Sequence, residues 1–280
     1  MSDTVASNAF SVALVLGGGG PVGLSWLAGL ATGLRDNGID LSLADRFVGT
    51  SAGAVVGAVL ADGGDPARLL RPPSPSSPPV RADPARMGEI FAVLRDPGQE
   101  PAQARRRAGE LALAAQVGEP DEHIARMGGL AGVAQWPARD LLVAAIDITT
   151  GERQVWTRDG AASLPEALAS SSAVPGVFPP IPIDGRHYID GGLGSPVNAD
   201  LAAGADVVVI FEPLAHMFPR VPSDRQLGSA TEISIVSDDD AIAAFGFDLF
   251  AMAALAPAHA AGVRQAADAA PRLKDVWPDR

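Results

Sequence analysis

The chain has 280 residues, of which 33 are acidic and 21 are basic, and its formal net charge is −12. This balance argues against a nucleic-acid partner, because phosphates attract basic surfaces. With 47% hydrophobic residues the chain can bury a large core, which excludes disorder throughout. The chain has no cysteine, which rules out disulfides, thiol nucleophiles and thiolate metal sites. We expect neither a metal ion nor any other cofactor.

The beginning of the chain shows no targeting signal. Residues 1–10 lack the basic start of a secretion signal, and the apolar stretch that follows is too short for the core of one. No window of the sequence approaches 18 apolar residues, so we expect no transmembrane segment. The sequence therefore predicts a cytoplasmic protein.

The N-terminal part of the chain alternates between strand and helix patterns. An apolar run at 12–16 ends in four glycines and predicts a buried strand, and a helix begins near Pro21. Residues 46–49 predict a second strand, and 52–61 predict a helix of small residues. This order predicts an α/β fold with a mostly parallel central sheet that helices flank on both faces.

We expect a single domain over residues 1–280. It contains an insertion at 71–135, which consists of a Pro- and Ser-rich loop and two or three helices, and which we interpret as a lid over a binding site. Further strands are expected at 141–150, 153–157, 186–190, 205–211 and 231–236, with a short helix at 163–171 and one long helical tail at 239–269. The apolar residues of this tail are expected to pack in the core: Phe245, Phe247, Leu249, Phe250 and Met252.

The first motif with chemical meaning is Gly49-Thr50-Ser51-Ala52-Gly53, a G-x-S-x-G sequence between an expected strand and an expected helix. On a sharp turn from strand to helix, a serine hydroxyl is held out at the carboxyl edge of the sheet. The glycines are needed because side chains there would collide with neighbouring backbone. The pattern alone is weak in a chain with 31 glycines, so its place between strand and helix supports the interpretation.

The second motif, Gly18 to Gly23, matches G-x-G-x-x-G after a strand. A dinucleotide site would need an acidic residue at the end of the next strand, but that strand ends in Gly49-Thr50-Ser51. The glycines instead leave backbone N–H groups at a helix start, where an anion such as the oxyanion of a tetrahedral intermediate can bind. A tight turn without a ligand is the alternative interpretation.

The third motif is Asp190-Gly191-Gly192, at the end of an expected strand. Read alone, this sequence is typical of a turn, because an aspartate side chain caps the turn and glycine accepts a positive φ.

Together, in this order and spacing, the three motifs resemble the patatin-like acyl hydrolases. Residues 145–152 (AIDITTGE) and 170–192 are also similar to that family, and the resemblance covers nearly the whole chain apart from 71–135. It implies Ser51 as nucleophile, Asp190 as general base and an oxyanion hole at Gly18, Gly19 and Gly20, with Gly23, Gly49, Gly53, Gly191 and Gly192 as motif glycines. The chain departs from the family at Val22, where Arg or Lys is common.

The resemblance implies a serine hydrolase that cleaves lipid or other carboxylic esters without a cofactor. Its expected partners are the lipid or ester substrate and, transiently, a membrane surface, with no nucleic acid. One alternative is an esterase of the α/β-hydrolase type, whose triad would combine Ser51 and Asp190 with His216 or His259. A second alternative is a catalytically weakened lipid-binding protein on the same scaffold, which Val22 suggests.

Overall fold

The computed structural model describes residues 11–70 and 80–278. Most of the expected Pro- and Ser-rich loop, residues 71–79, lies outside the described part of the chain. The described part of the predicted insertion, residues 80–135, contains three helices, which is the upper end of the expected number. Among the described residues, no helix combines the length and the apolar character needed to cross a membrane.

The centre of the fold is one eight-stranded sheet with the order β5-β6-β3-β2-β1-β7-β8, in which β4 also pairs with β3. The pairs of β1 with β2 and β7, of β2 with β3, and of β7 with β8 are parallel. The pairs β3–β4, β3–β6 and β5–β6 are antiparallel. The strands are β1 (Val12–Leu16), β2 (Arg46–Thr50), β3 (Asp140–Asp147), β4 (Arg153–Trp156), β5 (Ile181–Ile183), β6 (Arg186–Asp190), β7 (Val207–Glu212) and β8 (Thr231–Val236).

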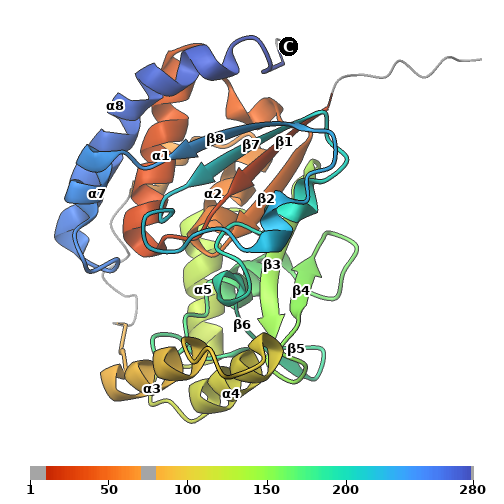
Figure 1. The fold of residues 1–280 in the computed structure, drawn as a ribbon, viewed down its shortest axis with the longest axis vertical. Helices are drawn as coiled ribbons and strands as arrows, with labels where there is room; N and C mark the ends of the chain where they lie inside the picture. Colours follow the sequence, from red (N-terminus) through yellow and green to blue (C-terminus); the bar gives the residue numbers. More distant parts are fainter. Residues whose placement is uncertain (1–10, 71–79, 279–280) are drawn as a thin grey trace, which may run out of the picture.

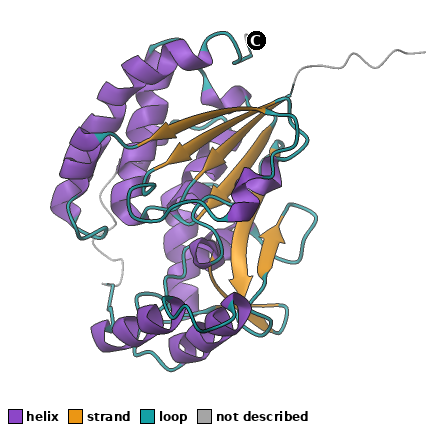
Figure 2. Cartoon of the chain, viewed as in Figure 1, coloured by secondary structure: helices purple, strands orange, loops and turns teal. Residues whose placement is uncertain are grey.

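The predicted α/β class with a mostly parallel sheet is confirmed, and the helices take up the space on both sides of it (Figure 1, Figure 2). Proline lies in the first turn of several helices, where its missing N–H costs nothing. The helices are α1 (Gly20–Asp36), α2 (Ala52–Ala61), α3 (Pro84–Leu94), α4 (Pro101–Leu113), α5 (Pro120–Ala131), α6 (Leu164–Ser171), α7 (Asp239–Phe245) and α8 (Leu255–Leu273).

The expectation of one long helical tail is wrong. Gly246 ends α7 with a φ of +65°, and α8 begins only at Leu255. The connection between the two helices also departs from the expected core packing. Phe245 is buried, whereas Phe247 is fully exposed and Met252 is 61% exposed. The glycine breaks the helical register, so the apolar spacing of the sequence no longer points these side chains to one face.

Alternation along the strands divides the core into layers. In β1, Leu14 and Leu16 face a large cluster that α1, α2, α6 and α8 complete. Ala13 and Val15 face the opposite side, where residues 197–202 and Leu227 cover the sheet. A third cluster joins α3 and α4 to β3 and β6, at the end of the molecule where Figure 1 shows those two helices.

Helices α1 and α8 approach closely enough for their backbones to touch. A Cβ atom built on Gly29 would lie 2.1 Å from the carbonyl oxygen of His259, and one on Gly262 would lie 2.3 Å from the carbonyl oxygen of Trp26. The indole N–H of Trp26 also donates to Gln265 Oε1 across the contact, at 3.1 Å. Only glycine at these positions allows the helices to pack at this distance.

We therefore expect Gly29→Ala to destabilise the fold by about 1–3 kcal/mol, because the added methyl meets backbone that must shift as a unit. Gly88 offers a matched control, since it lies in α3 with no atom within 4 Å of its missing side chain. Gly88→Ala should leave stability unchanged or raise it by about 0.5–1 kcal/mol through helix propensity. Urea denaturation of both variants measures the difference, and equal midpoints would contradict the close packing of α1 and α8.

Candidate active site

Ser51 lies on the sharp turn that joins β2 to α2. Its backbone has φ 53° and ψ −120°, outside the regions that residues other than glycine usually adopt. Such a conformation costs of the order of 1–3 kcal/mol and persists only where the surroundings impose it. Here the helix must start close to β1, because a Cβ on Gly53 would lie 2.0 Å from the carbonyl oxygen of Leu16. The G-x-S-x-G motif thus forms the strained strand-to-helix turn predicted from the sequence.

Asp190 ends β6 and faces Ser51 across β3. The strand register sets Thr50 opposite Ala144 on one side of β3, and Asp190 opposite Ala145 on the other. The Ser51 hydroxyl donates a hydrogen bond to Asp190 Oδ2 at 2.7 Å. Both side chains belong to residues that are only about 5% exposed. The structure therefore brings together the two residues that the sequence motifs suggested, although 139 positions separate them.

The environment of Asp190 favours a carboxylate that takes up a proton near neutral pH. Burial raises the pKa of Asp190 to about 6, against the hydrogen bonds from Ser51 and from the Gly192 N–H, which lower it. The Gly192 amide donates to Oδ1 at 2.7 Å and leaves Oδ2 to the serine. A base is most effective when its proton affinity lies close to the working pH, so this shift suits proton transfer.

The glycine-rich loop between β1 and α1 lies against Ser51. A Cβ atom on Gly18 would be 3.4 Å from Ser51 Cβ. The amide of Gly18 itself donates to the carbonyl oxygen of Pro196 at 2.9 Å, and that of Gly23 donates to Gly19 O at 2.8 Å. Within the described residues, the amides of Gly19 and Gly20 have no hydrogen-bond acceptor. The expectation that Gly18 supplies an oxyanion donor therefore conflicts with its existing bond, whereas Gly19 and Gly20 keep free N–H groups.

Val22, the departure from the family pattern, is fully buried beneath this loop. Its N–H donates to the carbonyl oxygen of Leu249 at 3.2 Å, which anchors the α7–α8 connection to the start of α1. A cationic side chain at this position would lose its hydration without gaining a solvent-exposed location. Any stabilisation of negative charge by this loop therefore comes from the backbone.

Ser171, the last residue of α6, contributes a contact that the motifs did not predict. Its buried hydroxyl accepts a hydrogen bond from the Ser51 N–H at 2.9 Å. This bond satisfies a backbone donor of the strained turn and links Ser51 to a helix far away in sequence. The run Ser170-Ser171-Ser172 was the available signal, but nothing in the sequence tells which hydroxyl faces Ser51.

The described histidines do not bond to either member of the Ser51–Asp190 pair, so the structure gives no support to the alternative triad. His123 bonds to Ser172 Oγ at 3.2 Å and stacks on Phe178, and burial with the nearby Arg126 charge lowers its pKa to about 3. His216 lies beside Phe245, and His259 belongs to α8. Within residues 11–70 and 80–278, no histidine forms a hydrogen bond with the serine or the aspartate, which bond to each other directly.

The fold and the site define an α/β protein in which a buried serine bonds to a buried aspartate beside a glycine-rich loop. A model of the family described as patatin-like phospholipase matches residues 14–203, which is more than half of the chain. The chain belongs to the patatin-like phospholipase family.

Two solved structures give a measure of the wider similarity. VipD from Legionella pneumophila is 18% identical with a TM-score of 0.39, over 73% of this chain and 50% of that chain. The ExoU–SpcU complex of the type III secretion system of Pseudomonas aeruginosa is 18% identical with a TM-score of 0.37, over 96% of this chain and 52% of that chain. The chain thus spans about half the length of the structures it matches.

The raised pKa of Asp190 predicts the pH dependence of any reaction that uses this carboxylate as a base. Because the protonated form cannot accept the serine proton, kcat/KM should rise as pH increases through about 6 and level off above it. A pH series on a soluble ester measures this limb. A rate independent of pH between 4.5 and 8 would contradict the assignment.

The raised pKa of Asp190 also makes the stability of the fold depend on pH. The pKa of Asp190 is higher in the folded state than its ordinary value of 3.8, so the folded state binds the proton more tightly, and stability falls as pH rises from about 4 to about 6. Asp190→Asn removes this cost of burying a charge. The variant should therefore gain stability over the wild type at pH 8, by up to about 3 kcal/mol, and less at pH 4. Urea denaturation at the two pH values compares them.

Proposed function

We propose that this protein is a serine acyl hydrolase that cleaves lipid or other carboxylic esters through a Ser51–Asp190 dyad. One observation carries the proposal: the Ser51 hydroxyl donates directly to a buried carboxylate with a raised pKa, beside a loop with two free backbone amides. Membership of the patatin-like phospholipase family supports a lipase or esterase type of function.

In the proposed reaction, the oxygen of Ser51 attacks the ester carbonyl while Asp190 Oδ2 takes the hydroxyl proton. The carbonyl oxygen becomes an oxyanion, which the N–H groups of Gly19 and Gly20 stabilise at the start of α1. As the tetrahedral intermediate collapses, Asp190 returns the proton to the leaving alkoxide, and an acyl-serine remains. Water then attacks the acyl-serine with Asp190 again as base, and releases the carboxylic acid and the free serine.

A weaker candidate is a lipid-binding protein with reduced catalysis on the same scaffold. The observation in its favour is the buried Val22 in place of a cation. Against it, Ser51 bonds directly to Asp190 beside two free amides, and backbone donors do not depend on the side chain at 22. Ester turnover by the purified protein distinguishes the two candidates.

We expect Ser51→Ala to remove both ester hydrolysis and labelling by a fluorophosphonate probe, since loss of a covalent nucleophile costs roughly 10⁴- to 10⁶-fold. Asp190→Asn should remove nearly all turnover, because an amide does not accept the proton. Turnover of a p-nitrophenyl ester and probe labelling on a gel measure the two effects.

The matched control is Ser25→Ala, which replaces another buried serine, on α1, and should leave labelling intact. Single changes of His123, His187, His216 and His259 to Gln should each keep the rate within about tenfold, which corresponds to about 1.4 kcal/mol. An inactive but folded histidine variant, or full labelling of Ser51→Ala, would overturn the dyad.

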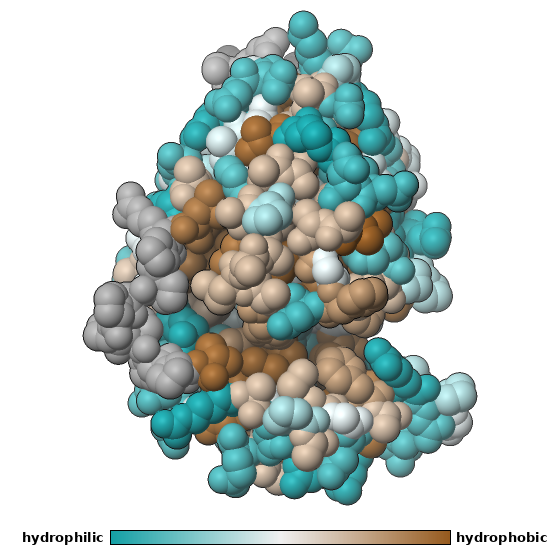
Figure 3. All heavy atoms as spheres, turned by 90° about the vertical axis from the view of Figure 1, so that its left-hand side faces the viewer, coloured by the Kyte–Doolittle hydropathy of each residue, from teal (hydrophilic) through white to brown (hydrophobic). Residues whose placement is uncertain are grey.

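Membrane contact, the finer part of the proposal, has a candidate surface in the α7–α8 connection. The exposed large apolar side chains of this connection are Phe247 and Met252. Figure 3 shows apolar residues gathered around a hollow on the side of the molecule that α7 borders. The connection also contacts the oxyanion loop, through the bond from the Val22 N–H to the Leu249 carbonyl. A net charge of −12 favours zwitterionic over anionic lipid.

Phe247→Asp should weaken binding to phosphatidylcholine vesicles by roughly 10- to 100-fold, because burial of a phenylalanine side chain contributes about 1.5–3 kcal/mol. Leu113→Asp, at an exposed apolar position on α4, is the control and should bind as the wild type does. Vesicle sedimentation measures the binding. Equal losses in the two variants would show that general hydrophobicity, and not this connection, governs adsorption.

A further inference from the structure

One short segment, Ser195–Asn198, contacts the neighbours of all the proposed catalytic groups. The Pro196 carbonyl accepts from the Gly18 N–H of the glycine loop at 2.9 Å. The Asn198 side-chain amide donates to Thr50 Oγ1, next to Ser51, at 2.9 Å. The segment itself follows Asp190 by only a few residues. It therefore connects the oxyanion loop, the nucleophile turn and the base.

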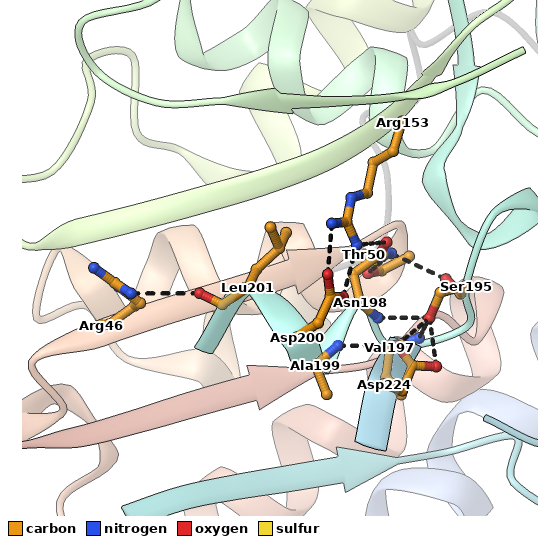
Figure 4. Close-up of polar contacts among 10 residues, drawn as sticks. All are labelled: Arg46, Thr50, Arg153, Ser195, Val197, Asn198, Ala199, Asp200, Leu201 and Asp224. Carbon is orange, nitrogen blue, oxygen red and sulfur yellow. Dashed lines mark hydrogen bonds and ion pairs between the residues drawn. The ribbon is translucent and has the colours of Figure 1, made fainter. Parts of the chain in front are cut away.

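Asn198 is fixed in a single orientation. The residue is fully buried and has a positive φ of 55°, and its Nδ2 donates to Ser195 O at 3.0 Å as well as to Thr50. Its Oδ1 accepts from Arg153 at 3.1 Å, and that arginine is held by a bidentate ion pair with Asp200 (Figure 4). Because Arg153 only donates and the Ser195 carbonyl only accepts, a flipped side chain would lose both of these bonds.

The backbone beneath Asn198 is anchored separately. Ser195 Oγ donates to the fully buried Asp224 carboxylate at 2.7 Å and accepts from the Asn198 N–H at 2.8 Å. Asp224 Oδ1 also accepts from the Ala199 N–H at 3.1 Å, as Figure 4 shows. These bonds hold the backbone of the segment independently of the Asn198 side chain, whose amide adds one bond within the segment and one to Thr50.

We propose that Asn198 is a positioning residue for the nucleophile, and that its hydrogen bond to Thr50 fixes the Ser51 turn relative to Asp190 and the glycine loop. The inference rests on the proposed hydrolase function. The backbone of Ser51 is strained, so hydrogen bonds from its surroundings have to keep it in this conformation. Ser171 Oγ binds its amide on one side, and Asn198 holds the preceding residue on the other.

Two substitutions at Thr50 separate this role from simple packing. Thr50 is fully buried, so Thr50→Val keeps its shape but removes the acceptor, whereas Thr50→Ser keeps the hydroxyl and removes a methyl group. If the bond positions the nucleophile, Thr50→Val should lower kcat by roughly 10- to 100-fold and change KM by less than about threefold. Small displacements of a reacting group lower rates by factors of this size. Thr50→Ser should keep kcat within about threefold of the wild type. If Thr50 only fills space, the order of the two variants reverses.

The donor side gives an independent measurement. Asn198→Gly removes the amide and suits the positive φ. It should lower kcat and the rate of fluorophosphonate labelling as Thr50→Val does, and the double variant should lose no more than the worse single one, because both remove the same bond. If circular dichroism shows that Thr50→Val does not fold, the kcat of Asn198→Gly is compared with that of Thr50→Ser instead.

If the wild type is active, three results overturn the positioning role and leave the proposed function standing. The kcat of Thr50→Val equals or exceeds that of Thr50→Ser, all single variants keep kcat within about threefold, or the losses of kcat multiply in the double variant. A wild type that neither hydrolyses the ester nor labels at Ser51 overturns the proposed function, and the positioning role with it.

Discussion

The hydrogen bond between Ser51 Oγ and Asp190 Oδ2 depends on a location from which water is largely excluded. Burial raises the pKa of the aspartate to about 6, so the bond joins a hydroxyl to a carboxylate that remains charged at neutral pH only at a cost in stability. The rest of the structure has to meet that cost. It does so with a large apolar core on one face of the sheet and with the hydrogen bond from the Gly192 amide to the carboxylate.

The arrangement of strands explains how two residues so distant in sequence meet. β3 lies between β2, which runs parallel to it, and β6, which runs antiparallel. The reversal brings the end of β6 to the middle of β3, at the level where β2 ends and its helix begins. A wholly parallel sheet would have placed the end of each strand at one edge, so the antiparallel part lets an aspartate approach the serine from across a neighbouring strand.

Polar side chains do much of the local positioning. Ser171 binds the amide of Ser51, and Asn198 binds Thr50, so both sides of the strained turn are held by neutral groups in the interior. Neutral hydrogen bonds avoid the large desolvation cost of an ion pair beside Asp190, and they would not lower the proton affinity of its carboxylate as a nearby cation would. The Arg153–Asp200 pair, which orients Asn198, lies at a remove and is itself partly exposed.

The sequence by itself determined the class of fold, the bounds of most strands and of helices α2 and α6, and the two residues at the centre of the site. Buried strands, proline-started helices and glycine turns are local patterns, and Val12–Leu16 and Ala52–Ala61 have the bounds that these patterns predict. The tertiary structure alone decided the antiparallel side of the sheet, the break at Gly246, the engaged amide of Gly18, and the roles of Ser171 and Asn198. Most of these features depend on which groups meet across distant parts of the chain. The sequence does not show which partner a buried hydroxyl or amide will bond to.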